Sequence, residues 1–263
     1  MPDQVEPLRP RATQIQLDLP RRPRRRPSGR PLTVHPIPAP PESEADLDVV
    51  VIDSPPLGER TEFWNTVTHC GAAVLAVLAG VAIVLRLVAG AAPVMQWLAG
   101  SLYALSLVYL YAASGLSHWH SWRHDPIRRG FWRRHDQVGI IVLAVTSFAP
   151  LAIHAQGLGR LVLPAMAMLS AALLVLLARS NRPTINPLYL AQLGWLPPLA
   201  GADISRVGGS LGIALALGGG LCYIGGLAFL FSDHRRWWCH PVWHLFTVTG
   251  SGMHYAFIVG WCL

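Results

Sequence analysis

Residues 71–85 read GAAVLAVLAGVAIVL, a run without one charged or hydrogen-bonding side chain. With its flanks, this run predicts a helix over residues 62–88, which exceeds the roughly 20 residues needed to cross a bilayer. Similar apolar stretches follow along the chain and are separated by short polar breaks. We therefore expect an all-α membrane protein, a bundle of seven transmembrane helices at residues 62–88, 93–116, 137–157, 160–178, 187–203, 209–231 and 241–262.

The composition agrees with this expectation. Hydrophobic residues make up 52% of the chain and charged residues 13%, and the mean hydropathy is +0.38. Such values exclude an ordinary soluble domain. They predict a multi-pass protein of the plasma or inner cell membrane, with the lipid bilayer as its partner. The cysteines lack the spacing of a thiolate metal site or a disulfide framework, so we expect buried, unpaired thiols: Cys70, Cys222, Cys239 and Cys262.

The distribution of arginine predicts the orientation of the bundle. With seven spans, 18 of the 21 arginines fall on one side of the membrane. Because cytoplasmic loops are enriched in positive charge, the N-terminus is expected in the cytoplasm and the C-terminus outside. The helix at 187–203 is the least regular, since it contains Pro197 and Pro198. Without this helix the count falls to six and the C-terminus changes side. Arg235 and Arg236 would then lie outside, which weakens the arginine bias, so the arginine distribution favours seven helices.

Residues 1–57 are predicted to form a disordered cytoplasmic tail before a membrane domain at 58–263. Proline recurs through the tail, apolar residues are sparse, and residues 20–27 read PRRPRRRP. A twin-arginine export signal requires an apolar segment after the arginines, and none follows this run. Nucleic-acid binding is disfavoured because no folded domain presents the arginines. We therefore expect the arginines to contact anionic lipid headgroups and expect no nucleic-acid partner.

Three histidines are predicted to meet at the cytoplasmic ends of the helices. His240 and His244 are four residues apart at the start of the last predicted helix, so both rings face the same direction. His118 closes the second predicted helix, which ends on the same side. Three imidazoles at one depth form a zinc site that leaves the fourth tetrahedral position for water. Each histidine alone would be interpreted as an interfacial or core residue.

Two polar residues suggest chemistry beside these histidines. Asp136 is expected to open the third helix at the same depth, and Ser114 lies one turn before His118 on the same helix face. A carboxylate close to a metal site can orient a water molecule and accept its proton. The combination favours hydrolysis.

Three motifs carry a resemblance to a known family, one at the first predicted helix, one across the second and third, and one at the last. They are EFWNTVTH at 62–69, SGLSH at 114–118, DQVGI at 136–140 followed by SFAP at 147–150, and HPVWH at 240–244 followed by His254. In order and spacing they resemble the progestin and adipoQ receptor family and the bacterial hemolysin III proteins. The resemblance covers residues 62–254 and excludes the tail. Two positions depart from the family pattern, Ser117, where an aromatic residue is common, and Pro241 after the first ligand of the last helix.

The resemblance implies a fold and a chemistry. It implies seven helices, a zinc ion held by His118, His240 and His244, and a water-mediated contact from Asp136. From the related eukaryotic receptors it also implies ceramidase-like hydrolysis of an amide, with Ser114 near the reacting water.

Other polar residues of the membrane domain are open to two interpretations. Glu62, Asn65 and His69 share one face of the first predicted helix and could form a second site, but we favour hydrogen bonds that fix helix packing. His254 lies about 21 Å deeper than His240 by helix rise and cannot share its metal. We expect His254 to form a structural hydrogen bond or to take part in substrate access.

The function predicted from the sequence is zinc-dependent hydrolysis of a lipid amide or ester, such as a ceramide, with Asp136 as the base that orients the attacking water. A membrane sensor or receptor with structural zinc is the first alternative. A pore or transporter is the second, and it is weaker because the apolar helices carry few charges to line a polar path.

Overall fold

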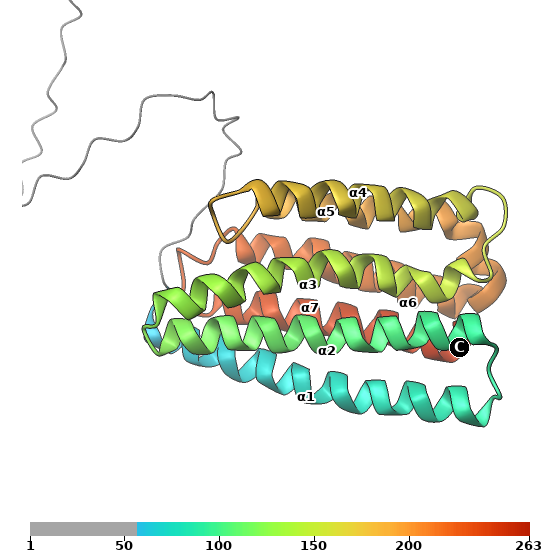
Figure 1. The fold of residues 1–263 in the computed structure, drawn as a ribbon, viewed down its shortest axis with the longest axis horizontal. Helices are drawn as coiled ribbons and strands as arrows, with labels where there is room; N and C mark the ends of the chain where they lie inside the picture. Colours follow the sequence, from blue (N-terminus) through green and yellow to red (C-terminus); the bar gives the residue numbers. More distant parts are fainter. Residues whose placement is uncertain (1–56) are drawn as a thin grey trace, which may run out of the picture. The chain divides into compact units, whose positions relative to one another are not determined.

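The structure is a computed structural model, and it describes residues 57–263. The predicted tail, residues 1–57, and its arginine run therefore lie outside the described residues except for Leu57. Within the described part the chain is helical and contains no strand. The main helices are α1 (Glu59–Ala89), α2 (Val94–Trp122), α3 (Pro126–Ala152), α4 (Gly159–Arg179), α5 (Pro187–Ala191), α6 (Gly201–Leu230) and α7 (Cys239–Phe257). In Figure 1, α1 to α4 pass back and forth as antiparallel neighbours.

α3 begins earlier than the sequence predicts. The predicted helix over 137–157 starts at Pro126 instead, because Asp125 caps it by accepting a hydrogen bond from the backbone N–H of Arg128 at 3.0 Å. Proline at the first helical position and an acidic cap are both typical start signals. Asp136 consequently lies inside α3 and does not open it.

The segment predicted as one helix over 187–203 is interrupted. It consists of the short helix α5 and two 3₁₀ turns, η1 (Gln192–Trp195) and η2 (Pro197–Ala200), after which α6 begins at Gly201. Pro197 and Pro198 have no backbone N–H to donate, which prevents a regular helix here. α6 is itself kinked at Gly209, whose φ of 58° and ψ of −153° are not helical.

α6 and α7 pack closely because glycines line their contact. A Cβ atom added at Gly226 would lie 2.6 Å from the ring of Trp243, and one added at Gly219 would lie 2.3 Å from the ring of His254. Small residues allow membrane helices to approach in this way. The end of α7 continues into one π-helical turn, η3 (Ile258–Cys262).

The outer surface of the bundle is apolar. On α1, for example, Leu75, Leu78 and Leu85 are each about 60% exposed. By length and composition, five helical stretches of residues 57–263 could cross a membrane: α1, α2, α3, α4 and Pro187–Leu230 taken together. α7 is not among them, since polar side chains interrupt it. Seven spans and their orientation therefore remain a prediction.

Three helix ends meet at one end of the bundle. The first turns of α1, the last turns of α2 and the first turns of α7 bring Glu62, His118 and His240 together there. The C-terminus lies at the opposite end (Figure 1). The polar residues singled out in the sequence gather where these three helices meet.

Candidate metal centre

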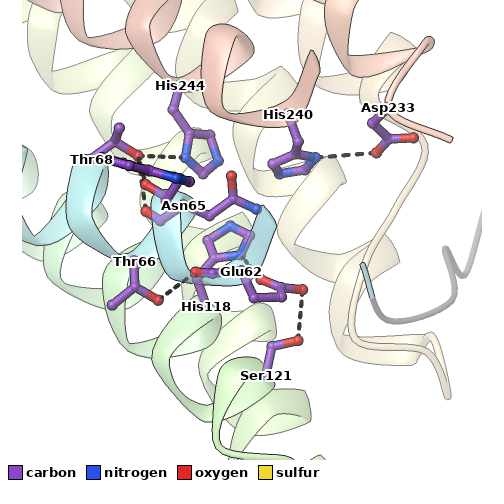
Figure 2. Close-up of polar contacts among 10 residues, drawn as sticks. Glu62, Asn65, Thr66, Thr68, His118, Ser121, Asp233, His240 and His244 are labelled. Carbon is purple, nitrogen blue, oxygen red and sulfur yellow. Dashed lines mark hydrogen bonds and ion pairs between the residues drawn. The ribbon is translucent and has the colours of Figure 1, made fainter. Parts of the chain in front are cut away.

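Three buried histidines form a cluster that can hold a metal ion. His118 comes from α2, and His240 and His244 come from successive turns of α7. One ligand atom from each lies within 4.8 Å of the other two. The sequence predicted this set, and the structure brings all three side chains together (Figure 2).

His118 is held by an acidic side chain of α1. Its Nδ1 lies 2.6 Å from Oε2 of Glu62, and the hydroxyl of Ser121 donates to Oε1 of the same carboxylate at 2.7 Å. An ionised carboxylate only accepts hydrogen bonds, so Nδ1 of His118 carries the proton. The lone pair of the ring is then on Nε2.

His244 is oriented by the same logic. The hydroxyl of Thr68 lies 2.9 Å from the carbonyl oxygens of Trp64 and Asn65 and 3.1 Å from Nδ1 of His244. Its one hydrogen goes to a backbone carbonyl, and the oxygen therefore accepts from Nδ1. The lone pair of His244 is again left on Nε2.

His240 has a carboxylate partner from the loop that precedes α7. Its Nδ1 lies 3.1 Å from Oδ2 of Asp233. All three rings thus carry a proton on Nδ1 and a lone pair on Nε2. Metal-binding histidines usually have this second hydrogen bond, which fixes the tautomer and the ring orientation. The cluster therefore has the donor atoms and the supporting partners of a metal centre.

The donor set fits zinc. Three neutral imidazoles are the protein ligands of many catalytic zinc sites, and imidazole also suits copper, nickel and iron. Every ligand is buried, which limits competition from bulk solvent.

Asp136 and Ser114 are the residues predicted for catalysis. Ser114 lies on α2, the helix that carries His118, and Asp136 lies on the adjacent helix α3. The Asp136 carboxylate of α3 interacts with the Ser114 hydroxyl of α2 and with Arg133. Within the described chain Asp136 is not one of the residues of the three-histidine cluster. Ser114 is buried one turn before His118.

The residues predicted as a polar face of α1 have different surroundings. Glu62 bonds His118 and Ser121 and so supports the metal ligands. The ring of His69 stacks on that of His244, with centroids 3.7 Å apart and planes at 28°. Asn65 is fully buried on the same face. His254 lies elsewhere, with its Nε2 3.0 Å from the carbonyl oxygen of Ala216.

Three supporting residues were not predicted from the sequence: Thr68, Ser121 and Asp233. A signal existed for Asp233, because acidic residues are scarce after residue 57 and ligating histidines usually need a carboxylate. Thr68 also had a signal, because it belongs to the EFWNTVTH motif at 62–69. Ser121 gave none, since hydroxyl residues are common in apolar helices.

Comparison with known families adds one match. Residues 58–255 match the family described as haemolysin-III related. The matched region contains every residue of the cluster and its supporting partners. Among curated proteins, none matches the chain.

Proposed function

Since the chain belongs to the haemolysin-III related family and is an integral, multi-pass membrane protein, we propose that it is a zinc-dependent hydrolase of a lipid amide or ester. The observation that carries this proposal is the three-histidine cluster with its Nε2 lone pairs free. A zinc ion held by His118, His240 and His244 would polarise a carbonyl group and make a water molecule more acidic.

The proposed reaction uses Asp136 as the general base. Water attacks the carbonyl carbon of the lipid, and its proton passes to the Asp136 carboxylate. The same proton then passes to the leaving nitrogen or oxygen as the bond from the carbonyl carbon to that atom breaks. The products are a fatty acid and an amine or alcohol. Ser114 interacts with Asp136 and would hold the carboxylate in position.

A lipid substrate suits the surroundings of the cluster. The centre lies among helices whose outer surfaces are covered with exposed leucine and valine. A substrate with acyl chains could remain partly in the bilayer while its polar group reaches the site. A ceramide, whose amide joins two long chains, is the class we propose.

We further propose seven spans with the metal centre at the cytoplasmic side. The kink at Gly209 supports this count, because it divides Pro187–Leu230 into two stretches, each of about 20 residues. Arginine placement supports the orientation. Arg60 stacks on Trp237 near the helix ends that form the metal centre. Arg86, Arg160 and Arg206 lie near the helix ends at the other side of the bundle. The arginine run at 20–27, outside the described residues, would then contact anionic headgroups.

Metal content and lipid cleavage together test the proposed function. Purified wild-type protein is expected to contain one zinc per chain and to cleave a fluorescent ceramide. Asp136→Ala should keep the zinc and lose activity by about 10²–10⁴-fold. His244→Ala should lose both. His124→Asn is a matched control, because His124 is an exposed loop residue with a positive φ that asparagine tolerates.

One outcome would favour a different function. The centre joins α1, α2 and α7 through Glu62, His118 and His240, so a metal there would also hold these helices together. Zinc-loaded protein that cleaves neither ceramide nor lysolipids would therefore support a sensor with structural zinc and contradict the hydrolase.

A further inference from the structure

Two buried polar side chains beside the metal centre have unused hydrogen-bonding groups. Asn65 is 0% exposed and His69 is 6% exposed. Within residues 57–263, the amide oxygen and nitrogen of Asn65 and both ring nitrogens of His69 find no hydrogen-bond partner. They lie four residues apart on α1 and so on one helix face.

Their neighbours on α1 differ in this respect. Both oxygens of Glu62 are bonded, and the hydroxyls of Thr66 and Thr68 bond backbone carbonyls of their own helix. Each buried polar group without a partner costs about 1–3 kcal/mol, and native proteins supply one from protein, water or ligand. The unused groups are therefore confined to Asn65 and His69 on this face.

Both side chains lie against the metal ligands. The His69 ring stacks on His244 at 3.7 Å and stands 6.2 Å from His118 between ring centroids. In Figure 2 the Asn65 amide points toward the three histidines of the cluster. A group bound at these free atoms would be adjacent to a metal-held carbonyl.

We propose that Asn65 and His69 bind the polar group of the lipid and that Asn65 selects amides over esters. This inference rests on the proposed function for the class of ligand. The Asn65 NH₂ group can donate to a lipid oxygen, while its carbonyl oxygen can accept from the N–H of a lipid amide. An ester has no N–H, so it would leave that buried oxygen unpaired. Sites built to bond a donor reject analogues that lack it.

His69 provides the second half of the subsite. A neutral imidazole has one donor and one acceptor nitrogen, which match a hydroxyl group. A hydroxyl next to the amide, as on a sphingoid base, would bond one of these two nitrogens. The lipid class is thus an N-acyl lipid with a neighbouring hydroxyl.

Binding measured without turnover tests the selection. The full chain in nanodiscs carries Asp136→Ala, and the probes are a short-chain fluorescent ceramide and its ester isostere, titrated by fluorescence anisotropy. The ceramide is expected to bind at least tenfold more tightly than the ester. Asn65→Leu removes both the donor and the acceptor that ceramide uses and should weaken ceramide binding at least tenfold. Ester binding should change less than twofold, because the lost donor to the ester oxygen is offset by removal of the unpaired amide oxygen.

Two further readouts separate ligand binding from a structural role. Zinc content should stay at one per chain in Asn65→Leu, and its melting temperature should be unchanged or higher, because the amide bonds nothing in the described protein. Thr66→Val is the matched control, since its hydroxyl bonds the carbonyl of Glu62 on its own helix, and it should leave the ceramide-to-ester ratio unchanged. His69→Phe, which keeps the ring stack, should abolish any preference for ceramide over its 3-deoxy analogue.

The outcomes distinguish this inference from the proposed hydrolase. Equal binding of ceramide and ester, binding of neither, or a ratio unaffected by Asn65→Leu would overturn the subsite and leave water as the partner of these groups. Preferential ceramide binding by a protein that never cleaves it would instead keep the subsite and contradict the hydrolase.

Discussion

Glu62 holds His118 with 2.6 Å between Oε2 and Nδ1, and the bond joins α1 to α2. Ser121 bonds the remaining carboxylate oxygen. The ring of His118 therefore keeps one tautomer and one orientation, with Nε2 available to a metal. α1, which supplies none of the three histidines of the cluster, thus controls how one of them is presented.

Removing the charge of Glu62 should weaken zinc binding. Glu62→Gln is expected to reduce zinc affinity about 10–100-fold, the usual cost of losing a supporting partner of a ligating histidine. Competition with a zinc-binding dye measures this. Glu59→Gln is the control, since that side chain is 75% exposed and, within residues 57–263, bonds the loop residue His124. An equal loss in both variants would contradict the role of Glu62.

Thr68 should matter through its oxygen alone. Thr68→Val removes the acceptor for Nδ1 of His244 at nearly constant volume and should lower zinc affinity about tenfold. Thr68→Ser keeps the hydroxyl and should restore affinity to within about twofold of wild type. The same dye competition compares the two. If serine fails to rescue, the methyl group and not the hydrogen bond is what counts.

Zinc should stabilise the bundle, because it would join α2 to α7. At zinc concentrations 100 times the dissociation constant, the added stability is about 2.7 kcal/mol. The melting temperature of the purified full chain should therefore rise with zinc and fall with a chelator. His244→Ala should show neither response. A zinc-dependent rise of the same size in His244→Ala would place the bound ion elsewhere.

The contact of α6 with α7 should depend on Gly226 and not on Gly220, another glycine of α6. Gly226→Ala places a Cβ 2.6 Å from Trp243 and should destabilise the protein by about 1–3 kcal/mol. At Gly220 an added Cβ meets no atom of the described chain within 4 Å. Gly220→Ala should thus be neutral or stabilising by about 0.5–1 kcal/mol. Thermal unfolding of both variants checks the difference.

Hydropathy predicted the helices where apolar residues are continuous. It missed a charged first part of one helix and the breaks in two others. The helix at 62–88 was placed within a few residues of α1 because its apolar run has clear limits. The early start of α3 was missed because residues 126–136 are charged, although Asp125 and Pro126 mark it. The split of 187–203 and the kink at Gly209 depend on backbone geometry that hydropathy does not describe.

For the site, periodicity predicted the ligands but not their partners. The spacing of His240 and His244 fixes their common face, and topology adds His118. Asp233 reaches His240 from a loop, and Thr68 reaches His244 through the rotation of α1. The spacing of residues within one helix predicts neither the course of the loop before α7 nor the direction that each face of α1 takes in the bundle.

The most direct test of the metal centre is X-ray absorption at the zinc edge of the purified wild-type protein. With one zinc per chain, we expect three imidazole nitrogens and one oxygen at about 2.0–2.2 Å. His118→Ala should remove one imidazole from the coordination shell of the metal, or abolish metal binding altogether. A sulfur ligand at about 2.3 Å, or protein that binds no zinc, would contradict the account.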